Sequence, residues 1–212
     1  VKACHLLEDF HLTPKVARYD IELNIALFEW IEGKTLLSVK NEHIDQALNF
    51  VEKLKELNSQ DLFQAASEAC TSAEQLFSQI EDRLQQLETV ENKHLQKFLN
   101  DVFKPLYQDV KKWSKQKWPS NNLRDKLPKA KQTLSPSDFG FHNSIFRTDG
   151  TLCFLDLEYF GWDDPVKLIT DFIWHPAMSL SIDQKIRWLD KSFSIFNNSE
   201  EIQQRFYAAW PL

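Results

Sequence analysis

The sequence predicts an α+β fold with a mostly helical body. Three observations favour this class. Two β-branched and aromatic runs, residues 16–19 and 25–31, stand near the beginning; an Asp-Gly turn signal lies in a further hairpin pattern around residues 144–154; and most of the rest carries apolar residues at helical spacing. The 212 residues suffice for one large domain or for one and a half.

The first two runs are expected to be strands joined by residues 20–24, the second ending near Gly33. Helices follow from Glu42, over residues 73–87 and over residues 94–113, the first capped at its end by Asn58. Their apolar stripes are expected to pack in the core: Ile44, Ala47, Leu48, Val51 and Leu54; Ala73, Leu76, Phe77, Ile80, Leu84 and Leu87; Leu95, Phe98, Leu99, Val102, Phe103, Leu106 and Val110.

Residues 111–131 differ in composition, with eight basic residues and one acid. We interpret them as a solvated helix end and loop, with a guide for an anionic ligand or a nucleic-acid patch as open alternatives. The net charge of −6 argues against a general nucleic-acid binder. Three widely spaced cysteines and the lack of a long apolar run predict a cytoplasmic protein that does not enter a membrane. Without an initial Met, we expect a piece of a longer protein.

The stretch of residues 135–156 carries the candidate chemistry. Asp149-Gly150 predicts a two-residue hairpin turn that places Asn143 opposite Asp156, while Asp138 lies in the preceding loop. Oxygen ligands of this kind suit Mg²⁺, and a third carboxylate suits a general base.

A capped helix follows the hairpin. Asp164 is expected at its N-cap and Pro165 at its first position, with the helix reaching about Trp174. Two further helices are expected, over residues 182–196 and from about Glu200.

These features resemble the aminoglycoside phosphotransferase and choline kinase superfamily of small-molecule kinases, which has a protein-kinase-like fold. Residues 138–143 match its Asp-x-x-x-x-Asn loop, residues 155–159 its hydrophobic-Asp-hydrophobic-Glu segment, and residues 161–165 its Gly-x-x-Asp-Pro. The resemblance extends from Leu6 to about Trp174. It divides the chain into the end of an N-terminal lobe with the hinge strand, residues 1–33, and a helical C-terminal lobe, residues 34–212, with the catalytic loop in residues 135–165.

The resemblance implies an ATP- and Mg²⁺-dependent phosphotransferase acting on a hydroxyl of a sugar, amino alcohol or aminoglycoside-like molecule. Asp138 would accept the hydroxyl proton, and Asn143 and Asp156 would bind Mg²⁺. Adenine would contact the hinge at Glu29, Trp30 and Ile31. An acidic and aromatic wall for the acceptor is expected from residues beyond the metal ligand, namely Glu158, Tyr159, Trp162 and Asp163.

Some features depart from the family pattern. Pro136 stands where the family usually has His, so that other contacts must order the loop. The acid usually found three residues past the Asp-Pro proline is replaced by Leu168, and Asp171 is the nearest acid. The glycine loop over the phosphates and the ATP-contacting lysine are missing, so this chain alone is expected to be inactive.

Other interpretations remain open. A nucleotide-binding pseudokinase or scaffold module would fit the same departures. A helical interaction protein would use the basic segment. A transition-metal hydrolase could use His142 and His175 with Asp138, Asp156 and Asp163, although no metal-binding spacing supports it.

Overall fold

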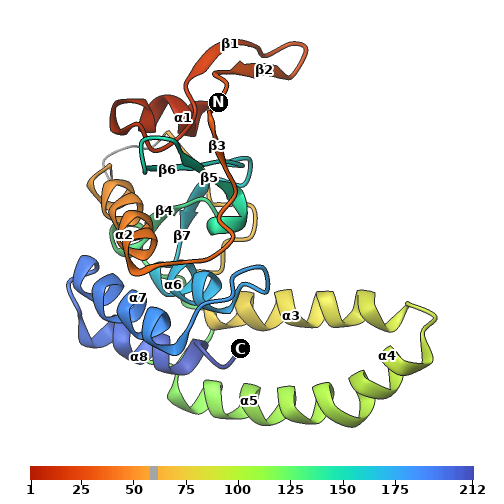
Figure 1. Ribbon diagram of the computed structural model, residues 1–212. Coiled ribbons are helices and arrows are strands. Elements are labelled where there is room, and N and C mark those ends of the chain that lie inside the picture. The colour runs from red at the N-terminus through yellow and green to blue at the C-terminus, as the bar shows by residue number, and fades with distance from the viewer. Residues whose placement is uncertain (58–61) are drawn as a thin grey trace. The chain divides into compact units, whose positions relative to one another are not determined.

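The computed structural model describes residues 1–57 and 62–212, so that Asn58, the expected helix cap, lies outside the described part. The chain forms two compact units: residues 1–69 with 133–197, and residues 70–132 with 198–212. The sequence-based boundary at residue 33 lies inside the first unit. An α+β composition is confirmed, with small sheets among many helices (Figure 1).

The first unit begins with α1 (Lys2–Leu7) and the 3-10 helix η1 (Glu8–Phe10), followed by the antiparallel pair β1 (Val16–Asp20) and β2 (Ile25–Phe28). The predicted second strand therefore ends at Phe28 rather than at Ile31. Glu29 still donates its N–H to the Lys15 carbonyl at 2.9 Å. The next position along the first strand is Pro14, which has no N–H to continue the ladder.

A three-stranded antiparallel sheet follows, in the order β3 (Gly33–Lys34), β5 (Ser144–Arg147) and β6 (Leu152–Phe154). Gly33 is a strand residue here, not only a strand breaker. A Cβ atom on Gly33 would lie 2.4 Å from the Phe146 carbonyl oxygen, so the close approach of β3 to β5 requires glycine.

The predicted hairpin is confirmed, but its register is wrong by one residue. Ser144 pairs with Phe154 and Ile145 with Cys153, around a three-residue loop at Thr148–Gly150. Gly150 alone in this loop has a positive φ, +88°, while the Asp149 carboxylate accepts the Thr151 N–H at 2.9 Å. This side-chain bond favours a type I turn followed by a glycine bulge over the two-residue turn. Asn143 therefore lies opposite Leu155, not Asp156.

Helices surround this hairpin. The first unit also contains α2 (Asn41–Glu56), α6 (Pro165–Trp174), α7 (Ile182–Ile195), the 3-10 helix η4 (Phe141–Asn143) and the antiparallel pair β4 (Thr133–Ser135) and β7 (Gly161–Asp163). The predicted stripe of α2 is buried, and Asp164 caps α6 by accepting the Val166 N–H at 2.8 Å. An aromatic core of Phe50, Phe139, Phe154, Phe172 and Trp188 joins these elements.

The second unit is helical, with α3 (Ala73–Glu88), α4 (Lys93–Phe98), α5 (Lys104–Lys117), the 3-10 helix η3 (Lys129–Lys131) and α8 (Glu200–Ala209). The helix predicted over residues 94–113 contains a π-helical segment, η2 (Leu99–Phe103), before Pro105. Proline lacks an N–H and its ring clashes with the carbonyl four residues earlier, so a wider turn is favoured there.

Part of the expected core of this unit is exposed. Phe98, Val102 and Leu106 are 50–60% exposed and Leu87 is 43% exposed, against the prediction that they are buried. Several cations of the basic segment pair with acids: Lys111 with Glu81, Lys131 with Glu201, and Arg124 with Glu74. Among the described residues, none of the helices has the length and apolar character that crossing a membrane requires.

Candidate active site

The loop that carries Asp138 is fixed on both sides by buried groups. Pro136 is buried after β4, and Phe139 inserts into the aromatic core with its ring centroid 5.2 Å from that of Phe50. Ser137 between them has φ +67°, a backbone conformation that few non-glycine residues adopt. The Asp138 N–H bonds to the Pro136 carbonyl at 3.0 Å. This turn leaves the Asp138 side chain 41% exposed at the surface of the core.

The Asp138 carboxylate is held by three side chains. His142 Nε2 lies 2.9 Å from Oδ1, and His175 Nε2 lies 3.2 Å from the same oxygen. The Asn143 amide donates to Oδ2 at 3.0 Å and to the Asp138 carbonyl at 3.0 Å. Since the side-chain N–H groups of Asn143 donate to Asp138, its amide oxygen is the atom that can bind a metal ion or another donor.

These contacts determine the protonation of the carboxyl group. Burial alone would raise the pKa of Asp138, but the hydrogen bond and charge of His142, the Asn143 hydrogen bond and the charge of His175 together lower it below its ordinary value. Burial and the neighbouring His142 charge lower the pKa of His175, against the opposing effect of Asp138. At neutral pH Asp138 is therefore ionised and acts as an acceptor of hydrogen bonds.

Asp156 lies one residue beyond the pairing of the hairpin. The Leu155 N–H donates to the Asn143 carbonyl at 2.8 Å, which brings the two chain segments together. Asp156 itself has φ +57° and an exposed side chain. Carboxylate and amide oxygens are ligands that suit a hard cation, and these two residues fit that donor set.

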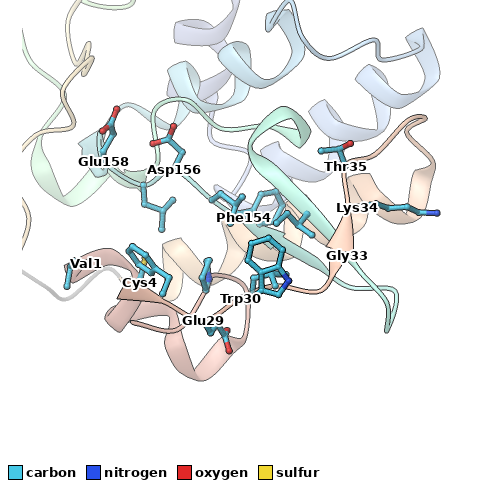
Figure 2. A pocket seen from close by; sticks show the side chains of 16 residues that line it. Val1, Cys4, Glu29, Trp30, Gly33, Lys34, Thr35, Phe154, Asp156 and Glu158 are labelled. Carbon is cyan, nitrogen blue, oxygen red and sulfur yellow. The ribbon is translucent and has the colours of Figure 1, made fainter. Parts of the chain in front are cut away.

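A pocket of about 630 Å³ lies beside this end of the hairpin. The chain contributes to it from Phe28–Ile31 and from Gly33–Thr35 on one side, and from Phe154–Glu158 on the other. Figure 2 shows the Asp156 and Glu158 side chains together at one end, with Trp30 and Glu29 toward the other. The pocket therefore joins the predicted hinge residues to a predicted metal ligand.

The hinge residues expose backbone groups. Among the described residues, no backbone hydrogen bond uses the Glu29 carbonyl or the Ile31 N–H. The Glu29 carboxylate accepts the Lys15 N–H at 3.0 Å, and the Trp30 ring is 85% exposed. A planar ligand with a donor and an acceptor edge would find both partners here.

The four predicted acceptor-binding residues separate into two pairs. Glu158 and Tyr159 are exposed beyond Asp156, and the Glu158 hydrogen bond raises the pKa of Tyr159. Trp162 and Asp163 are 3% and 1% exposed in β7. Their burial leaves Glu158 and Tyr159 as the members of this group that a ligand could reach.

The sequence grouped His142 and His175 with Asp138 only as a conceivable metal site and did not predict that the two histidines hold this carboxylate. The two histidines are 33 residues apart, and no spacing pattern connects them. With Asp138 they place three potential ligand atoms within 4.8 Å of one another. However, their rings stack at 3.9 Å between centroids and 4° between planes. An imidazole binds a metal in its ring plane at about 2 Å. At that distance two parallel rings with centroids 3.9 Å apart cannot both direct a nitrogen at one ion, so this arrangement does not fit a transition-metal site.

Comparisons with known proteins identify the family of the chain. Residues 1–193 match the model of the phosphotransferase enzyme family. The chain belongs to this family. No match was found among curated proteins.

Solved structures share the fold. The choline kinase LicA from Streptococcus pneumoniae matches with a TM-score of 0.59 and 16% identity, over 99% of this chain and 69% of that one. An aminoglycoside phosphotransferase from Alicyclobacillus acidocaldarius matches with a TM-score of 0.56 and 10% identity, over 99% and 68%. An ethanolamine kinase from Plasmodium vivax matches with a TM-score of 0.52 and 14% identity, and this chain spans only 61% of its length. The protein-kinase-like fold class is thereby confirmed.

Proposed function

We propose that the chain belongs to an ATP- and Mg²⁺-dependent phosphotransferase that moves the γ-phosphoryl group to a hydroxyl of a small molecule. The observation that carries the proposal is the exposed Asp138 carboxylate, held by Asn143 in a loop that adjoins Asp156 and the hinge pocket. Family membership supports it. Among the solved structures, LicA was determined with AMP and an aminoglycoside phosphotransferase with ADP.

Each group has a separate task in this proposal. The Glu29 carbonyl and Ile31 N–H would bind the adenine edge, beside the Trp30 ring. The Asn143 amide oxygen and the Asp156 carboxylate would hold Mg²⁺, which supplies charge neutralisation for the phosphates when it is bound. Asp138 would orient the acceptor hydroxyl and take its proton. Because its pKa is low, Asp138 is a weak base, which suits late proton transfer in a loose transition state.

Glu158 and Tyr159 would line the acceptor site, next to the transferred phosphoryl group. Sugars, amino alcohols and aminoglycosides are all candidate acceptors. The three cysteines, buried and free, are consistent with a reducing compartment, and we propose a cytoplasmic location.

The test uses the full natural protein with labelled ATP and a panel of choline, ethanolamine, aminoglycosides, sugars and nucleosides. Asp138→Asn keeps the shape of the side chain but removes its charge. We expect kcat to fall by at least about a hundredfold, as for loss of a general base, with KM for ATP nearly unchanged. The control Asp190→Asn changes an exposed carboxylate on α7 and should keep the wild-type rate. Equal rates for Asp138→Asn and the control would contradict the proposal.

A nucleotide-binding pseudokinase is the second candidate, favoured by Pro136 in place of the usual histidine. It predicts ATP binding, measured by calorimetry, without a labelled product from any acceptor. A product from any acceptor, lost in Asp138→Asn, would exclude it.

A further inference from the structure

The catalytic loop is contacted by the segment that follows α6. His175 lies directly after that helix, and its ring stacks on His142 of the loop. Met178 is buried, and its sulfur lies 3.3 Å from the Phe141 backbone nitrogen, which donates to it. His175 and Met178 are themselves joined by a backbone hydrogen bond of 3.0 Å. The short turn between them therefore reaches the loop at two points.

The hydrogen bonds of His175 define its tautomer. The Ala177 N–H donates to Nδ1 at 3.2 Å, so Nδ1 carries no proton. In a neutral imidazole the proton is then on Nε2, which faces Asp138 Oδ1 at 3.2 Å. His175 is thus set up by its own backbone turn to present an N–H toward the carboxylate.

His142 has fewer polar contacts than His175 to hold its ring in place. Its Nδ1 is buried and has no hydrogen-bond partner in the described part of the chain. Its remaining polar contact is Nε2 to Asp138, and its face is covered by the parallel His175 ring. His175 consequently supports Asp138 twice, through its own Nε2 and through the stacking that orients His142.

We propose that His175 is a positioning residue for phosphoryl transfer. It fixes the orientation of the Asp138 carboxylate, and it orders the loop in place of a histidine at position 136. This inference rests on the proposed function. The residue acts through Asp138 and need not contact the substrate. It explains how a loop with Pro136 keeps its acceptor carboxylate in a defined orientation.

Two substitutions separate stacking from hydrogen bonding, and the full natural protein is used. His175→Phe keeps a flat ring over His142 but has no N–H, whereas His175→Gln keeps an amide N–H near the position of Nε2. Loss of one hydrogen bond to a charged group corresponds to about a tenfold to hundredfold change. We expect kcat of His175→Phe to fall by this factor, with unchanged KM for ATP. We expect kcat of His175→Gln to lie much closer to the wild-type value. The control His94→Phe alters an exposed histidine on α4 and should leave kcat unchanged.

A double-mutant comparison adds a second criterion. If His175 acts through Asp138, His175→Phe should have no further effect in the Asp138→Asn background. An unchanged kcat in His175→Phe, equal losses in the Phe and Gln variants, or a full further loss in the double mutant would overturn the proposal.

A third measurement needs no activity, so that its failure differs from a failure of the proposed function. Imidazole ¹⁵N spectra, assigned by loss of the signal in His175→Gln, should show His175 protonated on Nε2 and not on Nδ1. The Nε2 proton should exchange with water faster in Asp138→Ala. A proton on Nδ1 in the wild-type protein would refute the inference even if the enzyme is active. If the tautomer is as expected but no acceptor is phosphorylated, the contact of His175 Nε2 with Asp138 stands and the proposed function fails.

Discussion

The loop of Asp138 is packed so closely that residue 140 must be glycine for reasons of space. A Cβ atom on Gly140 would lie 2.7 Å from both His142 Nδ1 and Met178 Sδ. The backbone of Gly140 is extended, so the restriction comes from these contacts and not from its φ angle. An added methyl group must displace the imidazole, the thioether or both.

Gly140→Ala is therefore expected to affect stability and activity together. Overpacking of this kind costs about 1–3 kcal/mol, and a shifted His142 would release one contact to Asp138, lowering kcat. Chemical denaturation and steady-state kinetics measure the two effects. Gly150→Ala is a matched control, since a Cβ at Gly150 meets nothing within 4 Å and the cost arises from φ +88° instead. It should destabilise the hairpin without changing kcat per folded molecule. Full activity and stability in Gly140→Ala would contradict the close contact.

At the scale of residues, the sequence predicts roles that depend on neighbouring residues, such as helix caps. It does not predict contacts between side chains that are far apart in the sequence. Asp164 as a helix cap depends only on its neighbours, and the structure has it. The contact of His175 with Asp138 depends on how α6 is placed on the core, for which the sequence has no local signal. Trp162 and Asp163 were expected near an acceptor because they adjoin the motif, but pairing of β7 with β4 buries them.

At the scale of elements, periodicity located helices well and turn geometry poorly. The stripe of α2 was recognisable because each buried residue recurs at helical spacing. The sequence Asp-Gly suits both a two-residue turn and a three-residue turn with a glycine bulge, and the Asp149 side-chain bond decides between them. The stripe in residues 95–110 indicated a helix correctly, but periodicity does not reveal whether another element covers it, and Phe98, Val102 and Leu106 are exposed.

One ion-pair cluster connects α2 to α7 and gives a pH-dependent prediction. Arg187 contacts Asp45 through two nitrogens at 2.9 and 2.6 Å, and Lys191 contacts it at 2.7 Å. The Arg187 hydrogen bond is the largest effect and lowers the pKa of Asp45 below its ordinary value, against a smaller opposing effect of burial. A carboxyl with a lowered folded-state pKa stabilises the fold above its unfolded-state pKa, and this contribution disappears as the pH falls through the folded-state pKa.

Asp45→Asn should accordingly lower Tm at pH 7 by a modest amount, since partly exposed pairs contribute about 0.2–1 kcal/mol each. The difference from wild type should shrink below about pH 4, where the unfolded-state carboxyl begins to take up a proton. Thermal unfolding between pH 7 and pH 3 measures it. Asp190→Asn, on an exposed residue of α7, is the matched control for the loss of one carboxylate charge. A constant difference for Asp45→Asn over this range would rule out the ion pair as its cause.

At the scale of the whole molecule, the pocket is lined mainly by two stretches that are far apart in sequence, residues 28–35 and 154–158. A ligand that contacts both stretches would stabilise the folded chain over the unfolded one, because the unfolded chain does not keep them together. Binding of such a ligand to the hinge, hairpin and metal residues is therefore coupled to the folding equilibrium. Thermal stability therefore reports on the proposed nucleotide site without any need for turnover.

ATP with Mg²⁺ should raise the Tm of the full natural protein. Saturation at 100 times Kd adds about 2.7 kcal/mol, which corresponds to a shift of several degrees. Chelation of Mg²⁺ should remove most of this gain, because the phosphates then meet Asp156 without charge neutralisation. AMP is the matched ligand control: with a single phosphate its smaller gain should depend little on Mg²⁺.

Asp156→Asn should retain the AMP gain and lose the Mg²⁺-dependent part of the ATP gain. If Asp156→Asn responds to ATP and Mg²⁺ as the wild type does, Asp156 is not the metal ligand, whereas loss of the AMP response as well would point to a damaged pocket.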